Sequence, residues 1–199
     1  MSMKTGMSSE QKVGWLTIAF LVALAIAMIV SAQIAHAEPA SRPTLVERLI
    51  AVQPSLQSLT DEPVDARELA ESIAAVPRIN LAWAALILTI AHHEATLSAR
   101  IAANDCKPKE CDGGRAWGLY QGHKNLHNAD VWGSPDIRVQ TLEAARALRR
   151  AFYLCNGRGK LRDDWVARTI NGYAGRRCDA AWDGLDKRLA TYNRIWRRL

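Results

Sequence analysis

The stretch LILTIAHHEATLSAR, residues 86–100, is an almost wholly apolar run that ends on two histidines and one glutamate. It lies within the segment RINLAWAALILTIAHHEA, residues 78–95, which directly follows Pro77. This segment predicts a helix that is apolar nearly all round, as the central buried helix of a domain would be. Its uncharged run is too short to cross a bilayer. We therefore expect the rest of the domain to fold around this helix.

Glu94 stands at the end of the predicted helix. Ala84, Ile87, Ala91 and Glu94 fall at i, i+3, i+7 and i+10, so they share one stripe of the helix surface. Burial among apolar groups favours the protonated form of a carboxyl, which is the form that a proton donor needs. Glu94 is therefore a candidate general acid. The alternative is that its side chain extends past the helix end into solvent.

Four further segments carry apolar residues at helical spacing. One of them begins at Asp163 and Asp164, either of which can cap a helix. Residues 98–137 are rich in glycine and predict loops with at most short strands. The four helical segments are VDARELAESIAAV (64–76), DIRVQTLEAARALRRAFYLC (136–155), DDWVARTI (163–170) and WDGLDKRLATYNRIWRRL (182–199). Together with residues 78–95 they predict a mainly α fold.

The first 37 residues predict an export signal. Lys4 and Lys12 precede an apolar run without charge, and Ala35 and Ala37 occupy the small-residue positions of a cleavage site. The apolar run is also about long enough to span a bilayer, so a retained membrane anchor is the alternative. Both interpretations place the rest of the chain beyond the inner membrane.

The remaining chain divides at Pro63. Residues 38–63 contain four prolines and predict a linker with at most a short helix at residues 45–52. Residues 64–199 predict the folded domain. Its half from residue 100 on is basic, with twenty Lys and Arg against eleven Asp and Glu. Such a charge favours an anionic partner, which for an exported protein is cell-wall polymer or a membrane surface and not nucleic acid.

All four cysteines lie in the exported part of the chain. Thiols in an oxidising compartment predict disulfides, here two. Three pairings are possible, of which Cys106 with Cys111 and Cys155 with Cys178 link near neighbours. The spacing lacks the close cysteine pairs of zinc sites, so we expect no metal.

Two segments downstream of Glu94 strengthen the prediction that it is a general acid. They are GGRAWGLYQGHKN, residues 113–125, and ARTINGYAGRRC, residues 167–178. With Glu94, they make the chain resemble the lytic transglycosylases of the goose-type lysozyme superfamily. That family has a helix that delivers one catalytic Glu, then an A-x-G-L-[MFY]-Q segment, then a Tyr-Asn-x-Gly segment. The resemblance covers residues 80–199, with the three elements in the family's order.

The resemblance implies a lysozyme-like helical domain in which Glu94 is catalytic and no cofactor is needed. The substrate-binding residues that it implies are Gly118, Leu119, Tyr120, Gln121, Asn171 and Tyr173. Gly118 would let main chain approach a sugar, and the amide of Gln121 offers a donor and an acceptor. Tyr120 and Trp117 could pack on sugar rings, with core packing as the alternative. The chain departs from the family pattern at Ala95, where the family has Ser, and at Ile170, where it has Tyr.

The activity implied by the resemblance is cleavage of the MurNAc–GlcNAc bond of peptidoglycan glycan strands with formation of 1,6-anhydro ends. If Asp105 or Asp112 positioned a water, the enzyme would be a hydrolase of the lysozyme or endolysin type instead. A non-catalytic wall-binding protein and a membrane-anchored assembly protein that docks through residues 183–199 are further alternatives. The expected location is the periplasm or the cell exterior, at the inner membrane if the anchor is retained.

Overall fold

The computed structural model describes residues 42–56, 62–107, 109, 115–123, 133–157 and 162–199. The predicted signal or anchor, residues 1–37, lies outside them. In the described residues no helix is both long enough and apolar enough to cross a membrane. From Pro43 on, the chain belongs to one folded unit that is mainly helical, as the sequence predicts.

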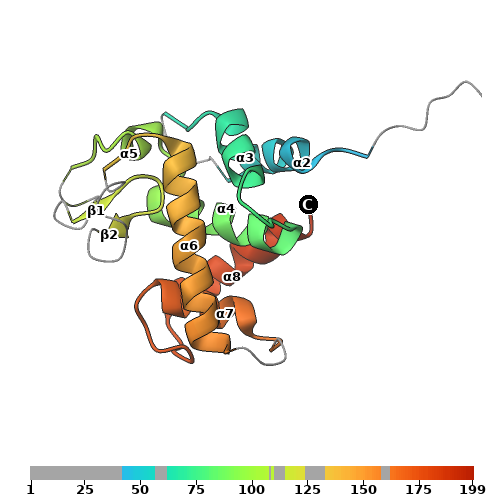
Figure 1. Ribbon diagram of the computed structural model, residues 1–199, viewed down its shortest axis with the longest axis vertical. Coiled ribbons are helices and arrows are strands. Elements are labelled where there is room, and N and C mark those ends of the chain that lie inside the picture. The colour runs from blue at the N-terminus through green and yellow to red at the C-terminus, as the bar shows by residue number, and fades with distance from the viewer. Residues whose placement is uncertain (1–41, 57–61, 108, 110–114, 124–132, 158–161) are drawn as a thin grey trace, which may run out of the picture. The chain divides into compact units, whose positions relative to one another are not determined.

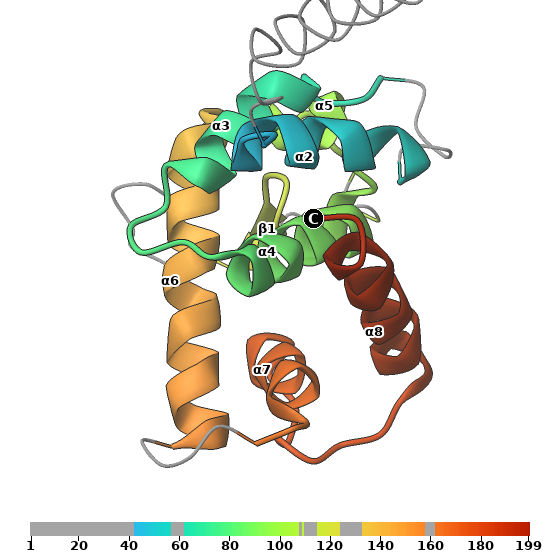
Figure 2. The same ribbon diagram turned by 90° about the vertical axis from the view of Figure 1, so that its right-hand side faces the viewer.

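The helix predicted at the centre is α4, Leu81–Ala95. Asn80 caps it by accepting a hydrogen bond from the backbone amide of Trp83 at 3.0 Å. Its residues 84–91 are all buried. Figure 2 shows α4 in the middle of the unit, with other helices on either side of it. The prediction of a buried central helix is confirmed.

In the described residues, two short α-helices precede α4. Helix α2, Leu45–Val52, begins with a capping box between Thr44 and Glu47, and a 3-10 helix, Gln53–Ser55, extends it. Helix α3, Ala66–Ala74, is capped by Asp65. Apolar side chains of α2 and of the turn after it lie in the core, namely Leu49, Val52 and Leu56. The helix expected at residues 45–52 is therefore present, and it packs as part of the domain instead of lying in a linker.

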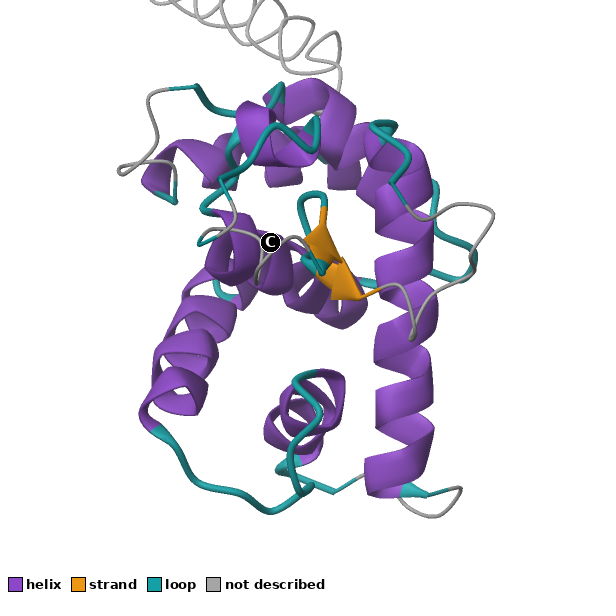
Figure 3. Cartoon of the chain, turned by 90° about the vertical axis from the view of Figure 1, so that its left-hand side faces the viewer, coloured by secondary structure: helices purple, strands orange, loops and turns teal. Residues whose placement is uncertain are grey.

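The glycine-rich region holds a short helix and a small hairpin. Helix α5 is Ala99–Ala102. Strands β1, Ala116–Trp117, and β2, Gly122–His123, pair antiparallel, with Trp117 opposite Gly122. Figure 3 shows this hairpin beside α4. The short strands expected between residues 98 and 137 are thus a two-stranded hairpin.

Helices α6, Ile137–Asn156, and α7, Trp165–Tyr173, pack against each other. Gly172 allows this close approach, because a Cβ atom there would stand 2.9 Å from Sγ of Cys155. The disulfide Cys155–Cys178 then ties the end of α6 to the chain that follows α7. This second predicted pair is confirmed. Cys106 is also disulfide-bonded, whereas its predicted partner, Cys111, lies outside the described residues.

The last helix, α8, is Asp183–Trp196 and packs on α4. His93 of α4 shares a 2.9 Å hydrogen bond with the hydroxyl of Thr191 of α8. The chain then returns to α2, where the guanidinium of Arg48 donates a hydrogen bond to the carbonyl of Leu199. Figure 1 follows this order along the chain, with α8 in red beside the green α4. Helix α4 therefore presents its C-terminal end to α8.

Candidate active site

Glu94 lies in the last turn of α4, at the end of a buried stripe. Ala84, Ile87 and Ala91 of that stripe are fully buried, and the side chain of Glu94 is 22% exposed. The helix ends immediately after it, because Thr96 and Leu97 both take the left-handed conformation, with φ of 52° and 59°. A β-branched residue in that conformation is uncommon and strained. The backbone therefore turns sharply beside the carboxyl.

The carboxyl of Glu94 is held by Arg188 of α8. Nη2 of Arg188 donates a hydrogen bond to Oε1 of Glu94 at 2.6 Å. The arginine side chain is 15% exposed, and its Nη1 donates to the carbonyl of Gly184 at 3.2 Å. Such a charge-assisted hydrogen bond is short and strong compared with one between neutral groups. The two helices that meet at this end of the unit are thus joined through the candidate acid.

Arg188 itself rests on Trp182, the residue just before α8. The guanidinium carbon lies 4.9 Å from the centroid of the indole ring, within the range of a cation–π contact. Arg176 lies over the same ring at 4.2 Å. The indole Nε1 donates to Oδ1 of Asn171 at 2.8 Å. The amide of Asn171 in turn donates to the carbonyls of Cys178 and Ala180.

Asn171 and Gly172 of the third matched segment therefore have structural roles. Asn171 is 1% exposed, and all of its hydrogen bonds stay within the loop between α7 and α8. Gly172 lies at the contact with α6. The resemblance implies that Asn171 binds substrate, but its buried side chain instead orients Trp182, which supports Arg188.

The second matched segment, residues 116–121, forms β1 and the turn after it. Gly118 has φ of 67°, and its backbone amide donates to Oδ1 of Asn104 at 2.8 Å. The backbone amide of Leu119 donates to Oε1 of Gln140 at 2.7 Å. A Cβ atom on Gly118 would come within 2.4 Å of that same Oε1. The glycine is therefore required by a close side chain of α6 as well as by its backbone angle.

The side chains of this segment point mostly into the core. Leu119 is fully buried, and Tyr120 and Trp117 are only 3% and 5% exposed. The hydroxyl of Tyr120 shares a 3.0 Å hydrogen bond with Thr141. The expectation that the ring of Tyr120 packs on a sugar needs correction, because its faces are covered by protein. The amide of Gln121, half-buried, donates to the carbonyl of Gly118.

Tyr173 connects this segment to Glu94. Its hydroxyl donates to the backbone carbonyl of Tyr120 at 2.7 Å. Burial raises the pKa of the Tyr173 phenol well above its ordinary value, and the negative charge of Glu94 raises that pKa further. The hydroxyl of Tyr173 thus joins the end of α7 to the segment that contains Gly118 and Tyr120, and the charge of Glu94 acts on its phenol. Ile170 stands where the resemblance places a tyrosine.

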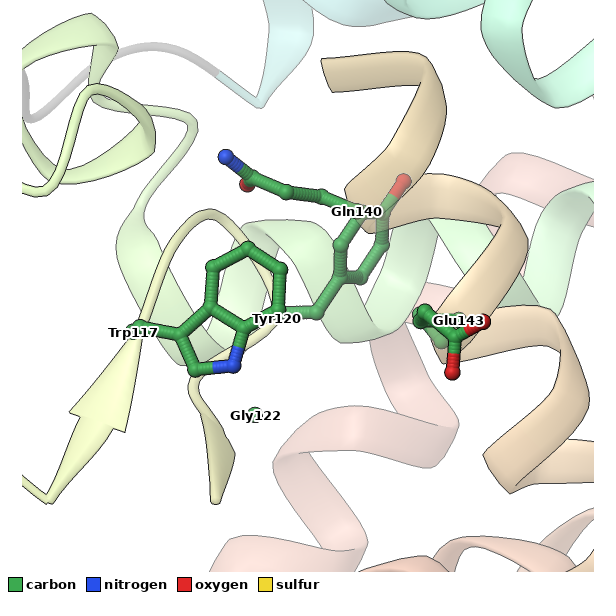
Figure 4. A pocket seen from close by; sticks show the side chains of 6 residues that line it. Trp117, Tyr120, Gly122, Gln140 and Glu143 are labelled. Atoms are coloured by element: carbon green, nitrogen blue, oxygen red, sulfur yellow. The ribbon is translucent and has the colours of Figure 1, made fainter. Parts of the chain in front are cut away.

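A small pocket opens beside Tyr120. Figure 4 shows it between the hairpin, which contributes Trp117 and Gly122, and α6, which contributes Gln140 and Glu143. Its free volume is about 10 Å³, which is room for about one water molecule. Glu143 is buried there and pairs with Arg146. The pocket is too small for a sugar ring.

Arg188 is the residue of the site that sequence reasoning missed. It lies on a predicted helix, but twenty Lys and Arg follow residue 99 and no spacing distinguishes this one. The hydroxyl of Thr96, next to Ala95, donates to the carbonyl of Ala95 and not to the carboxyl. In the described residues, Arg188 and not a hydroxyl side chain holds the carboxyl of Glu94. Asp105 is exposed, and Asp112 lies outside the described residues.

The chain matches no family model, no curated protein and no solved structure. Its site has to be interpreted from its own chemistry. A partly buried carboxyl that is held on one oxygen by an arginine can exchange a proton with a bound substrate through its other oxygen.

Proposed function

We propose that this chain is an exported enzyme that cleaves the glycan strands of peptidoglycan, as a lytic transglycosylase with a lysozyme-like domain. The observation that carries the proposal is the meeting of three separate segments. Glu94 ends the central helix, its negative charge acts on the phenol of Tyr173, and the hydroxyl of Tyr173 binds the segment that contains Gly118 and Tyr120. These are the segments whose order along the chain resembles that family.

In the proposed reaction Glu94 acts twice. Its carboxyl first gives a proton to the glycosidic oxygen between MurNAc and GlcNAc, and this oxygen leaves with the electron pair of the bond to the muramyl C1. The carboxylate then takes the proton of the 6-hydroxyl on the same muramyl unit, whose oxygen bonds to C1. The product is a 1,6-anhydro end, and no water is consumed. Holding the hydroxyl next to C1 gives it a high effective concentration.

The location of the chain agrees with this substrate. The disulfide Cys155–Cys178 is consistent with an oxidising, exported location. The basic half of the chain suits a partner that carries negative charge, such as cell-wall polymer. The proposal includes an export signal at residues 1–37. This signal is either cleaved or retained as an anchor at the inner membrane.

One observation favours a second candidate, a wall-binding protein without activity. Glu94 pairs with Arg188, and a carboxylate in such an ion pair can be purely structural. The two candidates differ in a simple experiment. Residues 38–199 are incubated with purified peptidoglycan free of other lytic enzymes, and soluble fragments are measured.

The proposed enzyme releases fragments, and Glu94→Gln does not, because the amide keeps the shape of the side chain but cannot give a proton. Circular dichroism of the variant checks that it is folded. A folded Glu94→Gln protein with full activity would exclude Glu94 as the acid. A wild-type protein that binds peptidoglycan and releases nothing would favour the second candidate.

A further inference from the structure

We propose that Arg188 is a positioning residue that makes the two oxygens of Glu94 unequal, so that Oε2 is the oxygen that gives and takes the proton. The inference rests on the proposed function. Its basis is that Arg188 reaches the carboxyl through one nitrogen and one oxygen only, Nη2 and Oε1. Oε2 receives no hydrogen bond from the described part of the chain.

The chemistry of the carboxyl group explains why this matters. A protonated carboxyl has one hydroxyl oxygen and one carbonyl oxygen, and a guanidinium can only donate hydrogen bonds. In the protonated form that the proposed first step needs, Arg188 can therefore bind only the carbonyl oxygen, so that Oε1 is the carbonyl oxygen and Oε2 carries the proton. When Oε2 gives this proton to the glycosidic oxygen, the negative charge that forms on the carboxylate is already paired with Arg188. The same carboxylate then accepts the proton of the 6-hydroxyl on Oε2.

The surroundings of Arg188 fix its position. Nη1 donates to the carbonyl of Gly184, and the guanidinium carbon lies over the ring of Trp182, 4.9 Å from its centroid. Trp182 is in turn bound to Asn171. A guanidinium held by its neighbours loses little freedom when it binds the carboxyl. This arrangement is expected of a group that orients another side chain.

Arg176 offers a matched control. It lies over the same indole ring, with its guanidinium carbon 4.2 Å from the centroid, but it is exposed and makes no ion pair with Glu94. Changing Arg176 removes one guanidinium from Trp182 without touching the carboxyl. A difference between variants of the two arginines therefore reports on the contact with Glu94.

The first test needs no activity. Arginine side-chain NMR spectra of the ¹⁵N-labelled protein, residues 38–199, report rotation of each guanidinium about its Nε–Cζ bond. We expect slow rotation for Arg188 in the wild-type protein and fast rotation in Glu94→Ala, with the Arg176 signal unchanged. Fast rotation of Arg188 in the wild-type protein would overturn the inference.

The second test measures the rate of cleavage on soluble glycan strands. We expect Arg188→Gln to lower kcat by about 100–1,000-fold, the range seen when one fixed donor to a developing charge is lost, with KM changed by less than about threefold. Arg188→Lys should recover part of the rate, because it keeps the charge but not the planar fork. Arg176→Gln should stay within about twofold of the wild type. If Arg188→Gln does not fold, Arg188→Lys alone tests the inference, with a rate about 3–10-fold below the wild type.

The results separate the two proposals. If the wild-type protein cleaves and the folded Arg188 variants cleave at the same rate, the inference is overturned and the proposed function stands. An equal loss of rate in Arg176→Gln would also overturn it, because the effect would then belong to Trp182. If the wild-type protein does not cleave, the proposed function fails and the inference fails with it.

Discussion

At the scale of single residues, the site depends on a position that has no room for a side chain. Gly118 combines a left-handed backbone with a side chain of α6 directly against it. That side chain, Gln140, binds the backbone amide of Leu119 and the carbonyls of Ala102 and Ser134. Gln140 thus joins the turn of the hairpin to the end of α5 and to the segment before α6. Its side chain fills the space that a Cβ atom on Gly118 would need.

Gly118→Ala should therefore be costly. We expect a loss of about 2–4 kcal/mol in the free energy of unfolding, from backbone strain and from displacement of Gln140. Gly175→Ala is the matched control, because Gly175 has φ of 66° but a Cβ atom there would meet nothing within 4 Å. It should show the strain alone, about 1–2 kcal/mol. Urea unfolding measures both values, and equal losses would show that Gln140 is not displaced.

The sequence could single out Glu94 as a candidate because an apolar run that ends on a carboxylate is a local pattern, and because two downstream segments follow it in the order that the resemblance requires. It could not identify Arg188, because the partner of a buried carboxylate is decided by which helix crosses the end of α4. Nor could it tell that Tyr120 and Asn171 are buried. Their segments were found by motif, whereas the direction of a side chain depends on the packing of α6 and of the loop after α7.

At the scale of elements, local sequence signals predict where the helices begin and end. They do not predict which helices contact each other. Caps at Asn80 and Asp136 begin α4 and α6 close to the residues expected. Helix α7 runs on to Tyr173, beyond the predicted segment 163–170. Its extra turn packs on α6 through Gly172, a contact between distant parts of the chain that the local pattern does not show.

The contact between α4 and α8 should weaken in acid. Burial lowers the pKa of His93 from 6.5 to about 4. Smaller effects come from His92, Arg188 and Arg194, which lower this pKa, and from a hydrogen bond with the backbone of Lys187, which raises it. Between pH 6.5 and pH 4 the unfolded chain therefore binds a proton at His93 that the folded chain does not. The free energy of unfolding consequently falls as the pH falls through this window.

His93→Gln tests this effect. The amide cannot titrate, and it can still share a hydrogen bond with Thr191. We expect the variant to lose less stability than the wild type between pH 6.5 and pH 4, as measured by urea unfolding at several pH values. The pH dependence of stability that remains in the variant comes from His92, whose pKa is also lowered by burial, and from the acidic groups. An unchanged slope would show that His93 is accessible to protons in the folded protein.

At the scale of the whole molecule, the disulfide Cys155–Cys178 stabilises the fold and also holds a segment of the candidate site in place. Cys155–Cys178 closes a loop that contains α7 and thus Asn171 and Tyr173. Trp182, which supports Arg188, is bound to that loop. The sequence predicted this pair because four cysteines in an exported chain favour near-neighbour pairing. It could not predict that Trp182, which is bound to this loop, supports the arginine that pairs with Glu94.

Replacing Cys155 and Cys178 together by Ser should lower the free energy of unfolding by about 2–4 kcal/mol. The same double replacement at Cys106 and Cys111 is the control. It opens a much shorter predicted loop, and the loss is smaller because the entropy of loop closure grows with loop length. Urea unfolding under non-reducing conditions compares the three proteins. A larger loss at the shorter loop would contradict the account.

We propose that Glu94 cleaves a glycosidic bond with the sugar's own hydroxyl as the nucleophile. The most direct test is mass spectrometry of the fragments that residues 38–199 release from purified peptidoglycan, with Glu94→Gln as the inactive control. The account predicts muropeptides with 1,6-anhydro ends, each lighter by one water than the hydrolysis product and not reducible by borohydride. Fragments that have gained a water and can be reduced would contradict it and identify a hydrolase, in which case Asp105→Asn or Asp112→Asn should also lose activity.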